Sequence, residues 1–155
     1  MFLDFKSAFD SVNRSSLFST LTLRGVPTKY INLMKALYAE TSGRVRVYGH
    51  LSDSFPTTSG VRQGCPLSPF LFNFVVDMIM DITLQGLDDA GVEYFPVENL
   101  TDLDYADDIV LLFDLHDSAQ SALDKMAEVT ASFGMFFAPQ NLWLLPKIFG
   151  HRSLH

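Results

Sequence analysis

Leu103-Asp104-Tyr105-Ala106-Asp107-Asp108-Ile109-Val110-Leu111-Leu112-Phe113 places two adjacent aspartates between an extended lead-in and an apolar run. The run has the length and composition of a buried strand, and the lead-in alternates like a second strand. Two strands joined tightly at residues 106–108 form a hairpin with paired carboxylates at its tip. A bound divalent cation such as Mg²⁺ relieves the repulsion between such carboxylates. Because Asp is also a common turn residue, this stretch alone leaves a plain turn as an equal alternative.

The composition predicts one packed globular domain. The chain has 155 residues, of which 48% are hydrophobic and 14 are Phe. Its single cysteine, Cys65, excludes an internal disulfide and fits a reducing compartment. The N-terminus lacks the pattern of a signal peptide, and the longest apolar region, residues 70–80, is too short and too polar to span a membrane. We therefore expect an intracellular protein, in the cytoplasm or nucleus, without a membrane partner.

The net charge of −7 is distributed unevenly. Residues 1–65 contain eight Lys and Arg against four Asp and Glu, whereas residues 66–155 contain three against fourteen. The basic part could face a phosphate backbone while the acidic part carries metal ligands. Ordinary solvated surface is the alternative explanation.

Local signals predict an alternation of strands and helices. Phe2-Leu3-Asp4-Phe5 is typical of the end of a buried strand, where a carboxylate is placed for a ligand. Ser68 and Pro69 are expected as the N-cap and first residue of a buried helix. The predicted helices cover residues 13–24, 28–40, 70–85 and 117–133. The other predicted strands cover residues 44–48, 55–59, 92–95 and 135–138, with a turn at 51–54 between the first two.

The loop Gly60-Val61-Arg62-Gln63-Gly64-Cys65-Pro66-Leu67-Ser68-Pro69 is the second informative stretch. Its glycines permit close approach of the backbone, and Arg62 and Gln63 supply hydrogen-bond donors. Such a loop, leading into a helix, could bind an anionic group. An ordinary loop before a core helix is the alternative.

The order of these elements predicts an α+β fold, with helices packed on one face of a mainly antiparallel sheet. In that layout, the end of the first strand can lie beside the tip of the aspartate hairpin. Asp4, Asp107 and Asp108 would then form one carboxylate cluster.

Three stretches, in this order and spacing, resemble the motifs of a reverse transcriptase, an RNA-directed DNA polymerase of the type encoded by non-LTR retrotransposons. They are residues 2–12, residues 60–73 and the box Tyr105-Ala106-Asp107-Asp108. The resemblance covers residues 1–139. It implies a polymerase palm-like antiparallel sheet plus part of the fingers at about residues 28–60, and it assigns no domain to the atypical tail, residues 140–155.

The resemblance also implies the chemistry. Asp4, Asp107 and Asp108 would be catalytic and, with the main-chain carbonyl of Phe5, would bind two Mg²⁺ ions, for which Mn²⁺ could substitute. One ion would activate the primer 3′-hydroxyl and the other would neutralise the triphosphate and the leaving pyrophosphate.

Further substrate-binding residues follow from the same resemblance. The ring of Phe9 would pack against the sugar of the incoming nucleotide and exclude a 2′-hydroxyl; the alternative is an ordinary core aromatic. Gln63 would contact that nucleotide, Gly64 would let the backbone approach it, and Arg62 would add a further contact. Tyr105 would support the hairpin near the primer end.

The implied partners are an RNA template, a DNA primer and dNTPs. The remaining fingers and the thumb are absent from the sequence, so we expect a fragment of a longer polyprotein, truncated at both ends. In the tail, the family's lysine, a candidate proton donor to pyrophosphate, is missing. Two alternatives stay open: a catalytically incompetent retrotransposon remnant that at most binds nucleic acid, and a magnesium-dependent phosphohydrolase, which would not explain residues 60–69.

Overall fold

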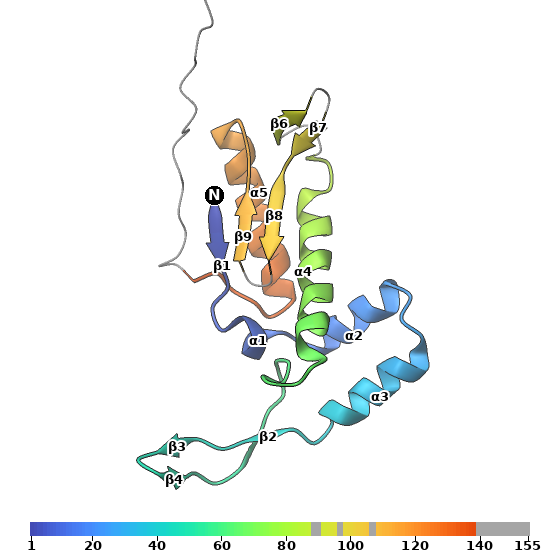
Figure 1. The fold of residues 1–155 in the computed structure, drawn as a ribbon, viewed down its shortest axis with the longest axis vertical. Coiled ribbons are helices and arrows are strands. Elements are labelled where there is room, and N and C mark those ends of the chain that lie inside the picture. Colours follow the sequence, from blue (N-terminus) through green and yellow to red (C-terminus); the bar gives the residue numbers. More distant parts are fainter. Residues whose placement is uncertain (88–90, 96–97, 106–107, 139–155) are drawn as a thin grey trace, which may run out of the picture.

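The computed structural model describes residues 1–87, 91–95, 98–105 and 108–138 (Figure 1). Its helices are α1 (Ala8–Ser11), α2 (Arg14–Leu23), α3 (Thr28–Tyr38), α4 (Ser68–Leu84) and α5 (His116–Ser132). Its strands are β1 (Phe2–Asp4), β2 (Ser42–Gly43), β3 (Arg46–Val47), β4 (His50–Leu51), β5 (Phe55–Pro56), β6 (Val92–Phe95), β7 (Glu98–Leu100), β8 (Asp102–Tyr105) and β9 (Asp108–Leu111). Within these ranges, no helix combines the length and apolar character that crossing a membrane requires.

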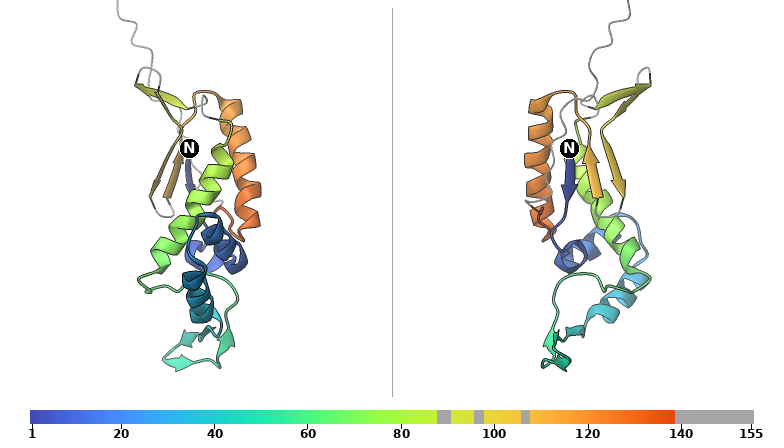
Figure 2. Two further views of the ribbon diagram at one scale, coloured as in Figure 1. Left: turned by 90° about the vertical axis from the view of Figure 1, so that its right-hand side faces the viewer. Right: turned by 60° about the vertical axis from the view of Figure 1, so that its left-hand side comes forward.

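A three-stranded antiparallel sheet in the order β1-β9-β8 forms the centre of the molecule. The long helices α4 and α5 pack on one face of this sheet, and the smaller helices lie beyond the end of β1 (Figures 1 and 2). The remaining strands form three two-stranded antiparallel ladders, β2 with β5, β3 with β4 and β6 with β7. The predicted α+β class, with helices on one face of an antiparallel sheet, is confirmed.

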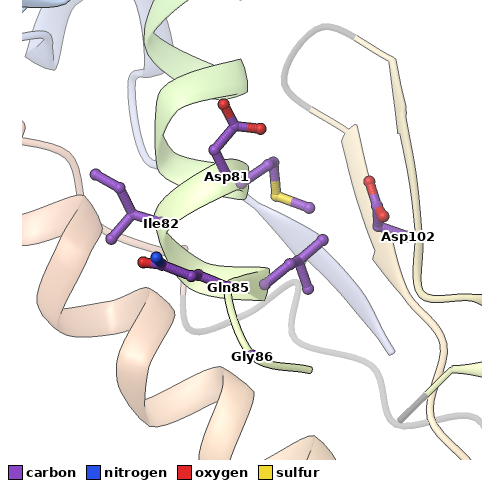
Figure 3. Close-up of a pocket in the computed structure, with 7 residues that line it drawn as sticks. Asp81, Ile82, Gln85, Gly86 and Asp102 are labelled. Carbon is purple, nitrogen blue, oxygen red and sulfur yellow. The ribbon is translucent and has the colours of Figure 1, made fainter. Parts of the chain in front are cut away.

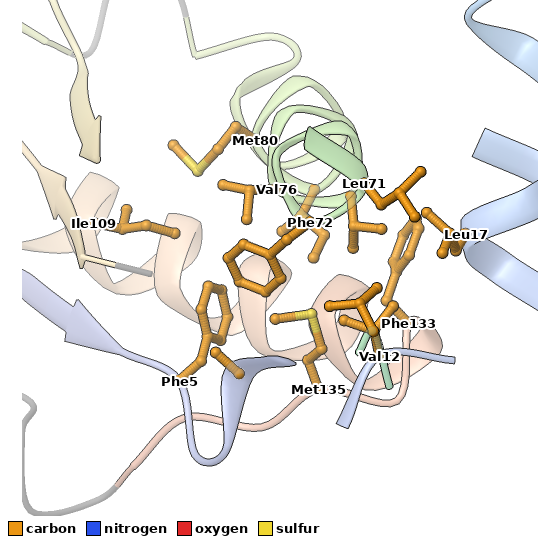
Figure 4. Close-up of a cluster of buried hydrophobic side chains, with 14 of the residues drawn as sticks. Phe5, Val12, Leu17, Leu71, Phe72, Val76, Met80, Ile109, Phe133 and Met135 are labelled. Atoms are coloured by element: carbon orange, nitrogen blue, oxygen red, sulfur yellow. The ribbon is translucent and has the colours of Figure 1, made fainter. Parts of the chain in front are cut away.

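Strand alternation determines which side chains of the sheet enter the core. Leu3 of β1 lies opposite Ile109 of β9, and both side chains are buried. They belong to one hydrophobic cluster with Phe72 and Val76 of α4 and Met126 of α5. Figure 4 shows Ile109, Phe72 and Val76 in this cluster. Because side chains alternate between the two faces of a strand, the neighbours of Leu3 and Ile109 are directed away from the helices.

The strands predicted at residues 44–48 and 55–59 are present in part, as β3 and β5, but they do not pair with each other: β3 pairs with β4, and β5 pairs with β2. The chain reverses at Tyr48 and Gly49, between β3 and β4, and not at residues 51–54. Both turn residues have positive φ, 47° and 82°, as in a type I′ turn, whose twist matches that of the flanking strands. The prediction was wrong because a tyrosine at the first position gives no sign of a left-handed backbone.

Two helix starts also test the sequence signals. The side chain of Asn13 caps α2 by accepting hydrogen bonds from the backbone N–H groups of Ser15 and Ser16, at 2.9 and 3.1 Å, which agrees with the helix predicted over residues 13–24. Ser68, in contrast, is the first residue of α4 and not its N-cap. Its hydroxyl donates instead to the carbonyl of Arg62, at 2.6 Å, because the preceding loop folds back over the helix start.

Two segments after the sheet hairpin differ slightly from expectation. Helix α5 begins at His116, one residue before the predicted start. Residues 135–138, predicted as a strand, contribute an antiparallel bridge between Phe137 and Phe5.

The predicted strand at 92–95, before the sheet hairpin, is confirmed as β6, whereas its partner β7 was not anticipated. The atypical tail, residues 140–155, lies outside the described residues.

Candidate active site

Asp4 and Asp108 face each other across the ladder of β1 and β9. Directly opposed residues of an antiparallel pair have Cβ atoms about 4.5–5.5 Å apart and lie on the same face of the sheet. Asp4 is half-buried and Asp108 is exposed. On the other side of β9, the backbone of Tyr105 is opposite Asp108. Asp107, the third predicted carboxylate, lies outside the described residues.

The register explains why both acids are on the open face. Leu3 and Ile109, their opposed neighbours, are buried against the helices. A shift of one residue would move these apolar side chains to solvent and both carboxylates into the core, so this register is strongly specified. Like charges that lie directly opposite each other destabilise a sheet, and a cation between them reverses that effect.

The oxygen donors of this pair suit Mg²⁺, but the pair alone is an incomplete site. Among the residues that the structure describes, no group of three His, Cys, Asp or Glu side chains could hold a metal ion. The described part of the chain therefore contributes two facing carboxylates. Asp107 precedes Asp108 in the sequence and is the predicted source of the third.

The end of β1 is held by the segment after α5. The backbone N–H of Lys6 donates to the carbonyl of Phe136 at 2.8 Å, and that of Ala138 donates to the carbonyl of Asp4 at 2.9 Å. The buried ring of Phe5 stacks on Phe137 with 5.4 Å between the centroids. These contacts fix the backbone at Asp4 and Phe5, the predicted metal-binding positions.

The predicted substrate residue Phe9 is brought next to the loop that follows β5. The backbone N–H of Val61 donates to the carbonyl of Phe9 at 2.7 Å, and that of Gly60 donates to the carbonyl of Val12 at 2.8 Å. The Phe9 ring packs on Phe72 with 4.9 Å between the centroids, yet Phe9 is only half-buried. Phe9 thus belongs to the edge of the core and keeps an exposed part that a ligand could contact.

The other three loop residues have different surroundings. The side-chain amide of Gln63 donates to both carboxylate oxygens of Asp10, at 3.1 Å each. The backbone N–H of Arg62 donates to the Tyr38 hydroxyl at 3.2 Å, and the exposed Arg62 guanidinium lies 5.8 Å from the centre of the Tyr38 ring. Gly64 has φ +80° and open space where a Cβ would be, so its backbone conformation favours glycine while packing does not.

Sequence reasoning missed two residues that organise this region, Asp10 and Arg14. Asp10 orients Gln63, and no local pattern signals that contact. Arg14 offered a signal: it is the first residue of α2, where the positive end of the helix dipole disfavours a cation. A cation at that position suggests that another part of the chain requires it.

An open pocket of about 550 Å³ at the C-terminal end of α4 lies apart from the predicted site (Figure 3). Its lining includes Asp81, Gln85 and Asp102 but none of the residues predicted for catalysis or substrate binding. Asp102 is directed to this side because it lies opposite the buried Leu111, on the helix face of the sheet.

Acidic side chains also gather beside this pocket. Burial, followed by the proximity of Asp104 and Asp81, raises the pKa of Asp77, whereas Arg24 opposes the rise. Arg24 forms an ion pair with Asp81 on the exposed side of α4. None of the residues in this acidic group was predicted to be functional.

Comparison with known proteins identifies the family. The sequence pattern of the family described as reverse transcriptase (RNA-dependent DNA polymerase) matches residues 1–141. The chain belongs to the reverse transcriptase family. This membership confirms the resemblance drawn from the three motifs.

The relatives of this reverse transcriptase chain include polyproteins of R2 retrotransposable elements. The retrovirus-related Pol polyprotein of the type-1 element R2 of Nasonia vitripennis is 32% identical over 146 residues, which cover 94% of this chain and 14% of the relative. The corresponding polyprotein of the type-2 element R2DM of Drosophila melanogaster is 32% identical over 133 residues, which cover 86% of this chain and 12% of the relative. The chain thus spans about one seventh or less of the length of these relatives.

Proposed function

We propose that this chain is part of an RNA-directed DNA polymerase that transfers dNTPs to a primer 3′-hydroxyl. Residues 1–139 would form part of the palm, with a fingers portion at about residues 28–60. The observation that carries the proposal is the opposition of Asp4 and Asp108 across two central strands. Two acids from distant segments of the chain face each other on the side of the sheet opposite α4 and α5, in a family named for polymerase activity.

The residues of the sheet and those of the adjoining loop would have different roles. Asp4, Asp107 and Asp108, with the main-chain carbonyl of Phe5, would hold two Mg²⁺ ions. Bound there, the ions would supply charge neutralisation at the attacking hydroxyl and at the triphosphate.

Positioning of the nucleotide would fall to the loop and to Phe9. The exposed part of the Phe9 ring would lie against the sugar and exclude a 2′-hydroxyl. Gln63, already oriented by Asp10, would contact the nucleotide, while Gly64 would let the main chain approach it. Arg62 would add a contact, and Tyr105 would support the hairpin near the primer end.

The partners in this proposal are an RNA template, a DNA primer and dNTPs. The R2 relatives are polyproteins several times longer than this chain, so we propose that the chain acts within a longer polyprotein. That polyprotein would supply the remaining fingers and the thumb.

Primer extension by the polyprotein that contains this chain tests the proposal. On an RNA template with Mg²⁺ and dNTPs, Asp107→Asn and Asp108→Asn should each lower extension about a thousandfold, because a metal ligand accounts for several kcal/mol of transition-state stabilisation. Asp117→Asn is the matched control, since this carboxylate is exposed on α5 and outside the predicted site. Unchanged extension by the Asp108 variant would refute the proposed role.

The same assay separates the alternative function. If the unmodified polyprotein binds RNA but extends no primer under any divalent cation, the chain is a catalytically incompetent remnant that binds nucleic acid. If it extends primers with Mg²⁺ or Mn²⁺, that alternative is excluded.

A further inference from the structure

We propose that Arg14 is a positioning residue of the polymerase site: its guanidinium fixes the loop that carries Gln63 against the segment that carries Phe9. The inference rests on the proposed function, because the two residues that it keeps together are the predicted nucleotide contacts. Arg14 acts through the loop backbone, and we assign it no contact with substrate.

The guanidinium of Arg14 donates hydrogen bonds to carbonyls of residues 57–60, a bend of the chain more than forty residues away. Its Nε donates to the carbonyl of Gly60 at 2.9 Å, one Nη donates to the carbonyl of Ser59 at 2.8 Å, and the other donates to the carbonyl of Thr57 at 2.8 Å. This second Nη also donates to the hydroxyl of Thr41, at 2.8 Å. Only a guanidinium offers five donors in a rigid planar fork that can serve this many acceptors at once.

The same bend is docked on the segment that precedes Arg14. The hydroxyl of Ser59 donates to the Asp10 carbonyl at 3.0 Å, in addition to the backbone hydrogen bonds that Gly60 and Val61 donate to Val12 and Phe9. The loop is therefore held on one side by the main chain of residues 9–12 and on the other by the Arg14 side chain. Between these two attachments, the loop can take only a narrow range of positions relative to Phe9.

The location of Arg14 supports a role outside its own helix. As the first residue of α2 it faces the unfavourable end of the helix dipole. Burial lowers its pKa, an effect that the nearby Tyr38 opposes and Arg62 adds to. The guanidinium also lies 5.0 Å from the centre of the Tyr38 ring, in cation–π geometry. The loop carbonyls and the Tyr38 ring stabilise the Arg14 cation at a position that the dipole of α2 alone would disfavour.

Steady-state kinetics on the polyprotein test the inference. Arg14→Ala should raise KM for dNTP about tenfold with a smaller change in kcat, and it should weaken discrimination against ribonucleotides, because the loop can then move away from Phe9. Arg14→Lys should fall between the wild type and Arg14→Ala, since one ammonium cannot serve three carbonyls in fixed directions. Arg24→Ala is the matched control: Arg24 is the C-cap residue of α2 and has one carboxylate partner, and KM should stay within about twofold.

Hydrogen exchange on the same proteins gives a readout independent of catalysis. In Arg14→Ala, the amides of Gly60 and Val61 should exchange about tenfold faster or more, while the amide of Ile79 in α4 should be unchanged. Unchanged KM together with unchanged exchange overturns the inference. A fall in active enzyme with normal KM in the remainder also overturns it, because a purely structural role predicts that result.

These outcomes are distinguishable from failure of the proposed function. If the unmodified polyprotein extends no primer, the polymerase proposal fails, and hydrogen exchange alone decides whether Arg14 holds the loop. In that case faster exchange of Gly60 and Val61 supports the attachment, and unchanged exchange refutes it.

Discussion

Gly60→Ala should be the most damaging of the glycine substitutions in the loop region. Gly60 has φ +79°, and an added Cβ would lie 2.7 Å from the carbonyl oxygen of Asp10 and 2.8 Å from that of Phe9. Both atoms belong to the main chain, so neither can rotate away as a side chain would. The loop would have to separate from the segment that carries Phe9.

The magnitude follows from two contributions. An alanine in the left-handed region costs about 1–2 kcal/mol. Separation of the loop also loses the backbone hydrogen bonds from Gly60 to Val12 and from Val61 to Phe9, each worth about 0.5–1.5 kcal/mol net. We therefore expect Gly60→Ala to lower the free energy of unfolding by about 2–5 kcal/mol.

Gly25→Ala is the matched control, because Gly25 has φ +78° and nothing within 4 Å of the added Cβ. It should show the conformational contribution alone, about 1–2 kcal/mol. Urea unfolding of the chain, followed by far-UV circular dichroism, measures both variants, and the difference should be about 1–3 kcal/mol. Equal destabilisation of the two variants would refute the argument that close approach of the backbone, and not φ alone, requires Gly60.

Three further predictions concern residues of α4, and urea unfolding at controlled pH tests them all. Phe72→Ala should destabilise the chain by about 3–5 kcal/mol, because the ring has 0% exposure; a loss below 1 kcal/mol would contradict its place in the core. Thr83→Val should stabilise it by about 1 kcal/mol, since the buried Thr83 hydroxyl has no hydrogen-bond partner among the described residues; destabilisation would indicate a partner. Asp77→Asn should stabilise the chain at neutral pH, because a carboxyl with a raised pKa destabilises the folded state above that pKa. The gain should vanish as the pH falls below the ordinary carboxyl value, and a gain that persists there would contradict the sign.

Much of the fold could be predicted because its signals are local. The alternation of Leu3 with Asp4, and of Ile109 with Asp108, assigns the apolar members to the core and the acids to the open face. Asn13 acts on N–H groups two and three residues away, so its capping role is visible in the sequence. Periods of two residues and short-range caps depend on neighbours along the chain, and composition therefore reveals them.

The sequence by itself also determined the family, because three ordered motifs retain the identities of the residues predicted for the chemistry. Only the tertiary structure decided how the segments meet: the facing of Asp4 and Asp108, the docking of Gly60 on Val12, and the convergence of loop carbonyls on Arg14. These partners are separated by more than forty residues, and the packing of helices and sheet brings them together. No local period or capping rule encodes such contacts, since they form only when the core places distant segments side by side.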